Sequence, residues 1–82
     1  MQGTRLADGW NEGIPPAGSY FKSARGVWMA TTPNGLLGDL GNHEVVEHED
    51  GTISVTPSIL VTTHRDEVQW HGFLERGVWR QV

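Results

Sequence analysis

The chain has 82 residues, no cysteine and a formal net charge of −4 at pH 7. It therefore offers one small core and excludes disulfides, thiolate chemistry and cysteine-based zinc knuckles. Ten acidic residues against six basic ones, without a basic cluster, argue against binding a nucleic-acid polymer. No apolar run approaches the roughly 18 residues of a membrane span, and the first residues lack a signal-peptide pattern, so we expect a cytoplasmic protein.

Glycine and proline recur along the chain at intervals too short for a helix of ordinary length, with room only for a single helical turn at residues 65–67. The segments between them are rich in Val, Ile, Thr and Trp, which favour strands. We predict an all-β fold, a small antiparallel barrel or a two-layer sandwich of about six or seven short strands built from hairpins.

Residues 1–18 differ from the rest, because Trp10 stands there among polar residues and glycines. We interpret this segment as an extended, irregular arm whose Trp10 packs on the sheet or on a partner. Residues 19–82 then form the β core, and the whole chain 1–82 is a single domain. The first hairpin of the core is expected over residues 19–32, with its turn between residues 22 and 26.

The strongest turn signal is Asp50-Gly51, which stands between two strand-like segments and favours a two-residue type I′ turn. This turn sets a register for the flanking residues, which pairs Glu49 with Thr52, His48 with Ile53, Glu47 with Ser54 and Val46 with Val55. The register places the apolar residues and His48 on one face and the polar residues on the other.

A second hairpin is expected to turn at Arg76-Gly77, which pairs Leu74 with Trp79 and Phe73 with Arg80. A three-residue loop with a bulge is the alternative. The face that carries Leu74 and Trp79 is the buried one, and Trp70 and Gly72 share it. Residues 59–63 are predicted to form a further strand.

Two segments carry a resemblance to known proteins: residues 47–60, EHEDGTISVTPSIL, and residues 70–79, WHGFLERGVW. They resemble an uncharacterised family of small bacterial and bacteriophage proteins, in which a strand-turn-strand ends in Pro-Ser-Ile and His-Gly-aromatic precedes a hairpin. The resemblance implies a phage or prophage gene product. Some relatives hold cysteine and histidine residues of the metal-ligand kind, and this chain lacks those cysteines.

Histidines and carboxylates are the remaining candidates for metal binding. His48 on the apolar face and His71 on the second hairpin could meet, and Glu44 would complete a zinc site. The alternative is that His48 is a half-buried histidine bonded to the backbone, and we expect no cofactor. Ser58, His64 and Asp66 supply catalytic residue types but no catalytic spacing, so we expect no enzyme.

Aromatic and arginine side chains are the candidates for binding. Trp28, Trp70 and Trp79 are expected in the core, whereas Trp10 and Phe73 are candidates for the surface. Arg76 and Arg80 lie close to Phe73 in sequence, and aromatic residues with arginine are common anchors of protein interfaces.

These features favour a phage-type accessory protein that binds another protein, with a homo-oligomer as one form of such binding. Inhibition of a host factor or an accessory role on a particle would both fit this function. One alternative is a module that sequesters a small nucleotide-like ligand between aromatics and arginines. The other is the histidine-based metal-binding domain.

Overall fold

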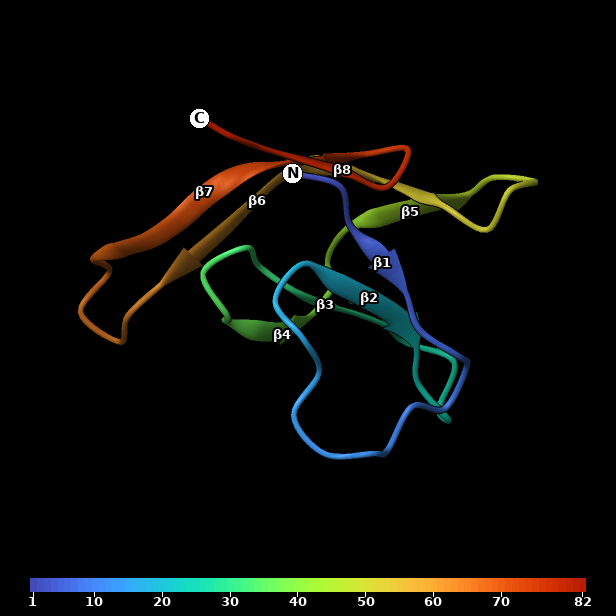
Figure 1. The fold of residues 1–82 in the computed structure, drawn as a ribbon. Helices are drawn as coiled ribbons and strands as arrows, with labels where there is room; N and C mark the ends of the chain where they lie inside the picture. Colours follow the sequence, from blue (N-terminus) through green and yellow to red (C-terminus); the bar gives the residue numbers. More distant parts are fainter.

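The computed structural model describes all residues 1–82, and it contains eight strands and no helix (Figure 1). The first sheet has the order β1 (Thr4–Arg5), β2 (Ser19–Lys22), β3 (Trp28–Thr31), β4 (Leu37–Asp39). The second sheet has the order β5 (Glu44–Glu47), β6 (Ile53–Thr62), β7 (Val68–Glu75), β8 (Val78–Gln81). The all-β fold is confirmed in its sandwich form, since the two sheets face each other without closing into a barrel. The structure holds no helix that could cross a membrane.

The two sheets are joined along one side by the first residues of the chain. Gln2 forms an antiparallel bridge with Val78, and the Gly3 amide donates to the Gly77 carbonyl at 2.7 Å. The β1 edge of the first sheet thus continues into the β8 edge of the second. On the opposite side β4 and β5 are both edge strands, so the sandwich is open there.

The arm predicted over residues 1–18 contains β1, which pairs in parallel with β2. The Leu6 amide donates to the Tyr20 carbonyl at 2.9 Å, and the Gly9 amide donates to the Lys22 carbonyl at 2.7 Å. The rest of the arm then passes over the side of the first sheet that faces away from the second (Figure 1). Phe21 lies on that side and is only 6% exposed. The arm therefore covers part of this face of the first sheet, whereas Leu37 of β4 on the same face is 50% exposed.

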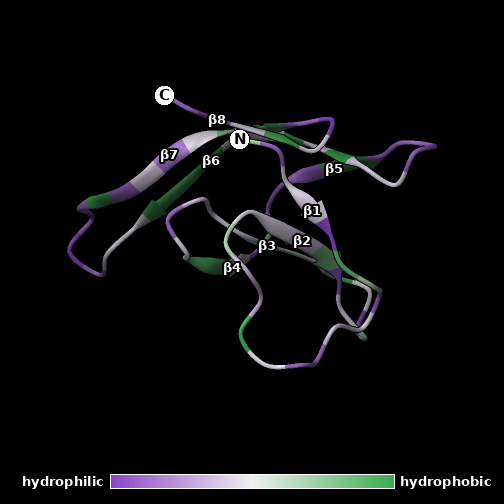
Figure 2. Ribbon diagram, in the orientation of Figure 1, coloured by the Kyte–Doolittle hydropathy of each residue, from purple (hydrophilic) through white to green (hydrophobic).

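The core lies between the sheets, where Tyr20, Ile53 and Leu74 are almost completely buried. The indole rings of Trp70 and Trp79 meet edge to face, with centroids 5.4 Å apart. Trp28 is half-buried against this cluster, so all three tryptophans expected in the core contribute to it. Figure 2 shows hydrophobic stretches on β4 and β6 and hydrophilic residues at the turns between β5 and β6 and between β6 and β7.

The hairpin of β7 and β8 has the predicted register. Leu74 pairs with Trp79 and Phe73 pairs with Arg80, and the loop is the two-residue Arg76-Gly77. Both loop residues have positive φ, 46° at Arg76 and 76° at Gly77, as a type I′ turn requires.

The register predicted for the Asp50-Gly51 hairpin is wrong by one residue. Val46 pairs with Ser54 and Glu47 pairs with Ile53. The loop has three residues, because the His48 amide donates to the Thr52 carbonyl at 2.8 Å, and of the loop residues only Gly51 has positive φ. A three-residue loop of this kind combines a type I turn with a left-handed glycine.

This shift moves His48 off the apolar face. His48 now lies on the same side as Val46, which is 48% exposed, and its Nε2 is 2.8 Å from the Ser54 hydroxyl. Glu47 takes the inward side, where Arg5 of the first sheet lies 3.0 Å from its carboxylate.

Three further expectations have mixed outcomes. The hairpin over residues 19–32 is confirmed as β2 and β3, with the Gly26 amide donating to the Ser23 carbonyl at 2.9 Å. The strand expected at 59–63 is the second half of the ten-residue β6. The helical turn suggested at 65–67 is wrong, because a tight turn there connects β6 to β7 and Asp66 takes a φ of 62°.

Candidate functional site

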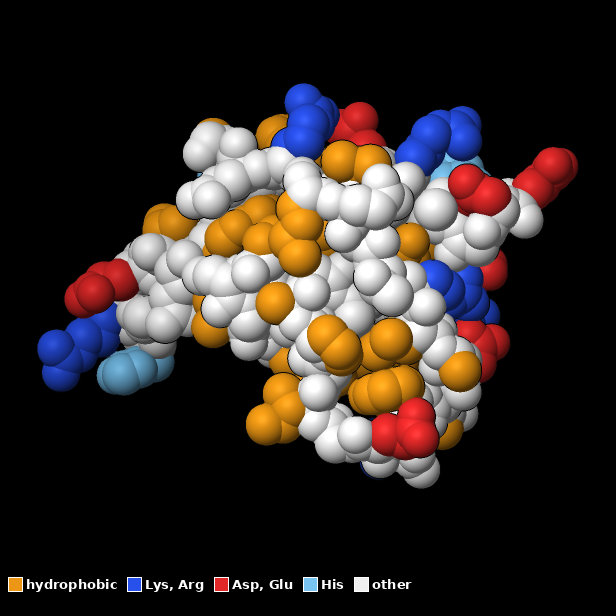
Figure 3. Space-filling model, in the orientation of Figure 1, with side chains coloured by type: hydrophobic (Ala, Val, Ile, Leu, Met, Phe, Trp, Pro, Cys, Tyr) orange, Lys and Arg blue, Asp and Glu red, His pale blue; other side chains and the backbone are white.

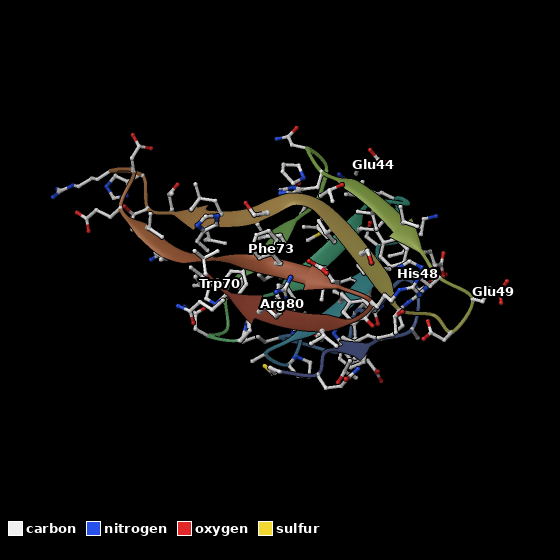
Figure 4. All side chains as sticks on the ribbon, turned by 90° about the horizontal axis from the view of Figure 1, so that it is seen from above. Glu44, His48, Glu49, Trp70, Phe73 and Arg80 are labelled. Atoms are coloured by element: carbon white, nitrogen blue, oxygen red, sulfur yellow. The ribbon has the colours of Figure 1, made fainter.

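The second sheet has one face directed away from the first sheet, and we call it the outer face. Strand alternation assigns its side chains, because Trp70, Gly72 and Leu74 point into the core and the residues between them point outward. The cross-strand pairs then give its members: Glu44, Val46, His48, Ser54, Thr56, Ser58, Leu60, His71, Phe73, Glu75, Val78 and Arg80. No other segment of the chain crosses this face (Figures 1 and 4).

Phe73 and Arg80, two of the predicted binding residues, lie beside each other near the middle of the outer face (Figure 4). The Arg80 guanidinium stands over the ring of Phe73, 5.4 Å from its centroid. It also forms an ion pair with Glu75 on the same face, with an N–O distance of 2.6 Å. Phe73 is half-buried and Arg80 is exposed, so the pair presents a flat aromatic and cationic surface to solvent.

Arg76, the other predicted arginine, lies apart from this pair at the turn between β7 and β8. Its amide donates to the Ser54 hydroxyl at 3.0 Å, and the same hydroxyl is bonded to His48. An open, wholly polar pocket of about 410 Å³ lies here, lined by Glu47, His48, Glu49, Asp50 and Arg76.

Asp50 in this pocket is held by its neighbour Thr52. The Thr52 hydroxyl donates to the Asp50 carboxylate at 2.6 Å, and the Thr52 amide donates to the same oxygen at 3.0 Å. These bonds favour the ionised carboxylate and lower the pKa of Asp50 below its ordinary value.

The residues predicted to bind zinc are not gathered into one group. His48 is bonded to Ser54, whereas His71 Nε2 lies 3.0 Å from the Ser58 hydroxyl. Glu44 lies opposite Thr56 at the β5 edge. No group of three or more His, Asp or Glu side chains in the structure could hold a metal ion.

Trp10, the remaining predicted binding residue, is half-buried in the arm. Its indole Nε1 is buried and has no hydrogen-bond acceptor. The arm turns at this point, where the Trp10 amide donates to the Ala7 carbonyl at 3.2 Å.

Sequence reasoning missed a second site, which we call the interlayer cleft. It is a pocket of about 320 Å³ on the open side of the sandwich, and seven of its twelve lining residues are hydrophobic. The lining residues come from both sheets and are Ala30, Thr32, Leu36, Gly38, Asp39, Leu40, His43, Ile59, Leu60, Val61, Thr62 and Trp79. Figure 3 shows hydrophobic side chains reaching the surface between the two layers, with charged ones over the second sheet and at the turn tips.

His43 is the histidine of the interlayer cleft. Its Nε2 is 3.2 Å from the Ser58 carbonyl, and its Nδ1 is buried without a hydrogen-bond partner. The sequence marks His43 only as a titratable residue before a strand, and no local pattern places it beside residues of β6.

Comparison of the chain with protein-family models, with curated proteins and with solved structures finds no match. The outer face and the interlayer cleft are therefore the two candidate binding surfaces of the chain.

Proposed function

We propose that this chain is a non-enzymatic accessory protein, of the kind that bacteriophages encode, and that it binds another protein through the outer face. One observation carries the proposal. The stacked pair of Phe73 and Arg80 lies near the middle of a sheet face that no other segment of the chain covers, whereas the arm covers part of the matching face of the first sheet.

The chemistry of the outer face supports a protein partner. Arginine and aromatic residues are enriched among the residues that contribute most to protein interfaces. Around the pair stand aliphatic side chains that are partly open to solvent, with Val46 48%, Leu60 53% and Val78 37% exposed. A partner that covers this face would bury them, and each buried methylene contributes about 0.8 kcal/mol.

Charged and polar side chains of the outer face form a rim around the pair of Phe73 and Arg80. Glu75 is paired with Arg80, and Glu44 and His48 stand at the β5 edge (Figure 4). A rim of this kind fixes the orientation of a partner more than it adds affinity. A second copy of the chain is one form that the partner could take, since β4 and β5 are unpaired edges.

A pair of variants tests the proposal. The tagged protein is incubated with an extract of the host cell, and bound proteins are identified by mass spectrometry. We expect Phe73→Ala and Arg80→Ala to lose a partner that the unaltered protein retains, while circular dichroism shows an unchanged fold. Val27→Ala is the matched control, because Val27 is 37% exposed at the turn between β2 and β3, away from the outer face.

Light scattering on the same samples distinguishes a second copy from a foreign partner. If the partner is a second copy, the unaltered protein has twice the monomer mass and Phe73→Ala has the monomer mass. Retention of the same partners by Phe73→Ala, at the same level as by Val27→Ala, would contradict the proposal.

A further inference from the structure

Strand β5 is an edge of the second sheet, and its free side carries unpaired backbone groups. The Ile53 carbonyl accepts from the Gly77 amide on the far side of β6, so the pair of Glu47 and Ile53 is not hydrogen-bonded. Because hydrogen-bonded and non-hydrogen-bonded pairs alternate in an antiparallel ladder, the amides and carbonyls of Val45 and Glu47 point away from β6. Figure 4 shows no other strand beyond β5 on this side.

We propose that the chain forms a two-fold symmetric dimer in which β5 pairs antiparallel with β5 of a second copy. The second sheets of the two copies then form one continuous sheet, and Val46 lies opposite Val46 of the second copy on the two-fold axis. The dimer goes beyond the proposed function, because it forms along a strand edge and leaves Phe73 and Arg80 on β7 and β8 of both copies open to solvent.

The direction of the free backbone groups restricts the register of this pairing. Val45 and Glu47 must lie in hydrogen-bonded pairs, because their amides and carbonyls are the ones that face the second copy. With Val46 on the axis, Val45 pairs with Glu47 of the second copy, and the symmetry repeats this pair. Each of these pairs exchanges both of its backbone hydrogen bonds. The register therefore satisfies the free edge of β5.

The same register places complementary side chains together on the outer face. Glu44 comes to lie opposite His48 of the second copy, and the symmetry produces this pair twice. Glu44 is exposed and forms no ion pair within its own chain. His48 contacts Ser54 through Nε2, and its other nitrogen, Nδ1, can donate to a carboxylate from the neutral or the charged ring. Opposite charges directly across an antiparallel pair stabilise it.

Registers shifted by two residues lose this match. A shift in one direction sets Glu47 opposite Glu47 of the second copy, and like charges directly across a pair are destabilising. A shift in the other direction sets Val46 opposite Glu44 of the second copy, and His48 then faces no carboxylate. A shift by one residue is excluded, because it would set the inward side chains of one copy beside the outward side chains of the other.

Strand β5 also lacks the features that usually keep an edge strand single, such as proline, lysine or a bulge. Its pairing with β6 is regular from Glu44 to Glu47, with Val45 and Val46 at the centre. The carboxylate of Glu47 is ion-paired with Arg5 beneath the sheet, and Val46 is 48% exposed in the single chain. Pairing with a second copy would cover this valine.

The other free edge, β4, does not offer an equivalent contact. It has three residues with Gly38 at the centre, and two-fold pairing would set Leu37 opposite Asp39 of the second copy. Pairing of β4 with β5 of another copy would leave one free β4 and one free β5 at the ends of each assembly, so it would not close. Pairing of β5 with β5 closes at two copies.

Sedimentation of the full chain at concentrations from about 10 μM to about 1 mM tests the dimer. We expect the average mass to rise toward twice the monomer mass over this range. Phe73→Ala should follow the same curve, which distinguishes this dimer from self-association through the outer face. Loss of a host partner by Phe73→Ala is a separate readout, so the dimer and the proposed function can fail independently.

Two lysine variants locate the contact. Val46→Lys sets like charges opposite each other on the two-fold axis, and it should keep the monomer mass at every concentration. Leu37→Lys is the matched control, because Leu37 is 50% exposed on the other edge strand, β4. Leu37→Lys should dimerise as the unaltered protein does.

Single cysteines test the register, since the chain has no cysteine of its own. Residues opposite each other in a non-hydrogen-bonded pair have Cα atoms about 4.5 Å apart, which is within the range for a disulfide. With oxidised glutathione, Val46→Cys should crosslink to a second copy at least about tenfold faster than Leu37→Cys, because pairing raises the effective concentration of the thiols. A mixture of Glu44→Cys and His48→Cys should crosslink faster than either variant alone.

The inference is overturned if the unaltered protein keeps the monomer mass at about 1 mM, if Val46→Lys dimerises as Leu37→Lys does, or if Val46→Cys crosslinks no faster than Leu37→Cys. The first of these readouts uses the unaltered protein, so it stands even if a variant fails to fold.

Discussion

The guanidinium of Arg5 lies 3.0 Å from the carboxylate of Glu47, and the same nitrogen donates to the Gly51 carbonyl at 2.8 Å. Arg5 belongs to the first sheet and Glu47 to the second, so this contact joins the two layers. Arg5 also stands over the ring of Trp28, 4.7 Å from its centroid. Partial burial acts to lower the pKa of Arg5, but the bonds and charges of Asp8 and Glu47 outweigh it, and the pKa lies above its ordinary value.

Replacement of Arg5 should therefore loosen the contact between the sheets. We expect Arg5→Ala to lower the free energy of unfolding by about 1–3 kcal/mol, since it removes a charge-assisted bond to a backbone carbonyl and a cation–π contact. Urea unfolding measures this change. Arg65→Ala is the control, because Arg65 is exposed and forms no ion pair, and it should change stability by less than about 0.5 kcal/mol. Equal effects of the two variants would contradict the role given to Arg5.

Gly72 occupies the tightest position in the second sheet. A Cβ at this position would overlap the Arg80 carbonyl and the ring of Trp70. We expect Gly72→Ala to destabilise the protein by about 3 kcal/mol or more, because the neighbours are backbone and a packed ring. Gly38→Ala is the matched control, since a Cβ there meets nothing, and it should be neutral or stabilising by up to about 1 kcal/mol. Thermal unfolding of both variants tests this difference. Equal melting temperatures of Gly72→Ala and Gly38→Ala would contradict the close packing described around Gly72.

Because Tyr20 is buried, we predict that the protein loses stability at alkaline pH. Burial raises the pKa of this single tyrosine above its ordinary value of 10.0, because the phenolate is disfavoured in the core. Below about pH 10 both the folded and the unfolded chain keep the proton, and above it the unfolded chain releases the proton first. Stability should therefore fall as the pH rises above about 10. Tyr20→Phe should show a shallower decline, and an identical decline in the variant would refute this assignment.

For Asp50 we predict a smaller loss of stability, at acid pH. The pKa of Asp50 is lowered by its two bonds from Thr52, so the ionised carboxylate favours the folded chain above the ordinary pKa of 3.8. This contribution is lost as the pH falls through the lowered pKa. Asp50→Asn should therefore reduce the difference between the melting temperatures at about pH 6 and about pH 3. No reduction in this difference would show that the carboxylate is not held as described.

The sequence predicted an all-β fold, as a small barrel or a two-layer sandwich, and it predicted one hairpin register correctly, because the signals for both are local. The turn at Arg76-Gly77 has a two-residue loop. The register that this loop sets pairs two apolar residues of the hairpin, Leu74 and Trp79, and both are buried in the core. Both signals are contained within about ten residues, so a local pattern suffices.

The Asp50-Gly51 hairpin differs because its observed register brings Glu47 into contact with a residue far away in the sequence. The observed pairing turns Glu47 inward beside Ile53, which an apolar pattern excludes. Arg5, 42 positions away, forms an ion pair with this carboxylate, whose side chain remains 48% exposed. The residue pattern of a hairpin contains no information about such a distant partner. In the observed register Val46 is exposed on β5, which is an edge strand of the second sheet.

The same difference between local and long-range contacts decides which candidate sites could be predicted from the sequence. Phe73 and Arg80 were predictable because they are a cross-strand pair on one hairpin. The interlayer cleft was not, since it combines β4, His43 and the second half of β6 from two different sheets. The spacing of residues within a short stretch of sequence gives no sign of packing between strands of two different sheets.

Binding of a protein through the outer face is the central claim, and site-specific photocrosslinking tests it most directly. A photoreactive phenylalanine analogue is introduced in place of Phe73 and, in a second protein, in place of Val27. We predict that irradiation in host cells yields one discrete protein adduct from position 73 and none from position 27. Adducts of equal yield and identity from both positions, or an adduct from position 27 alone, would contradict the claim.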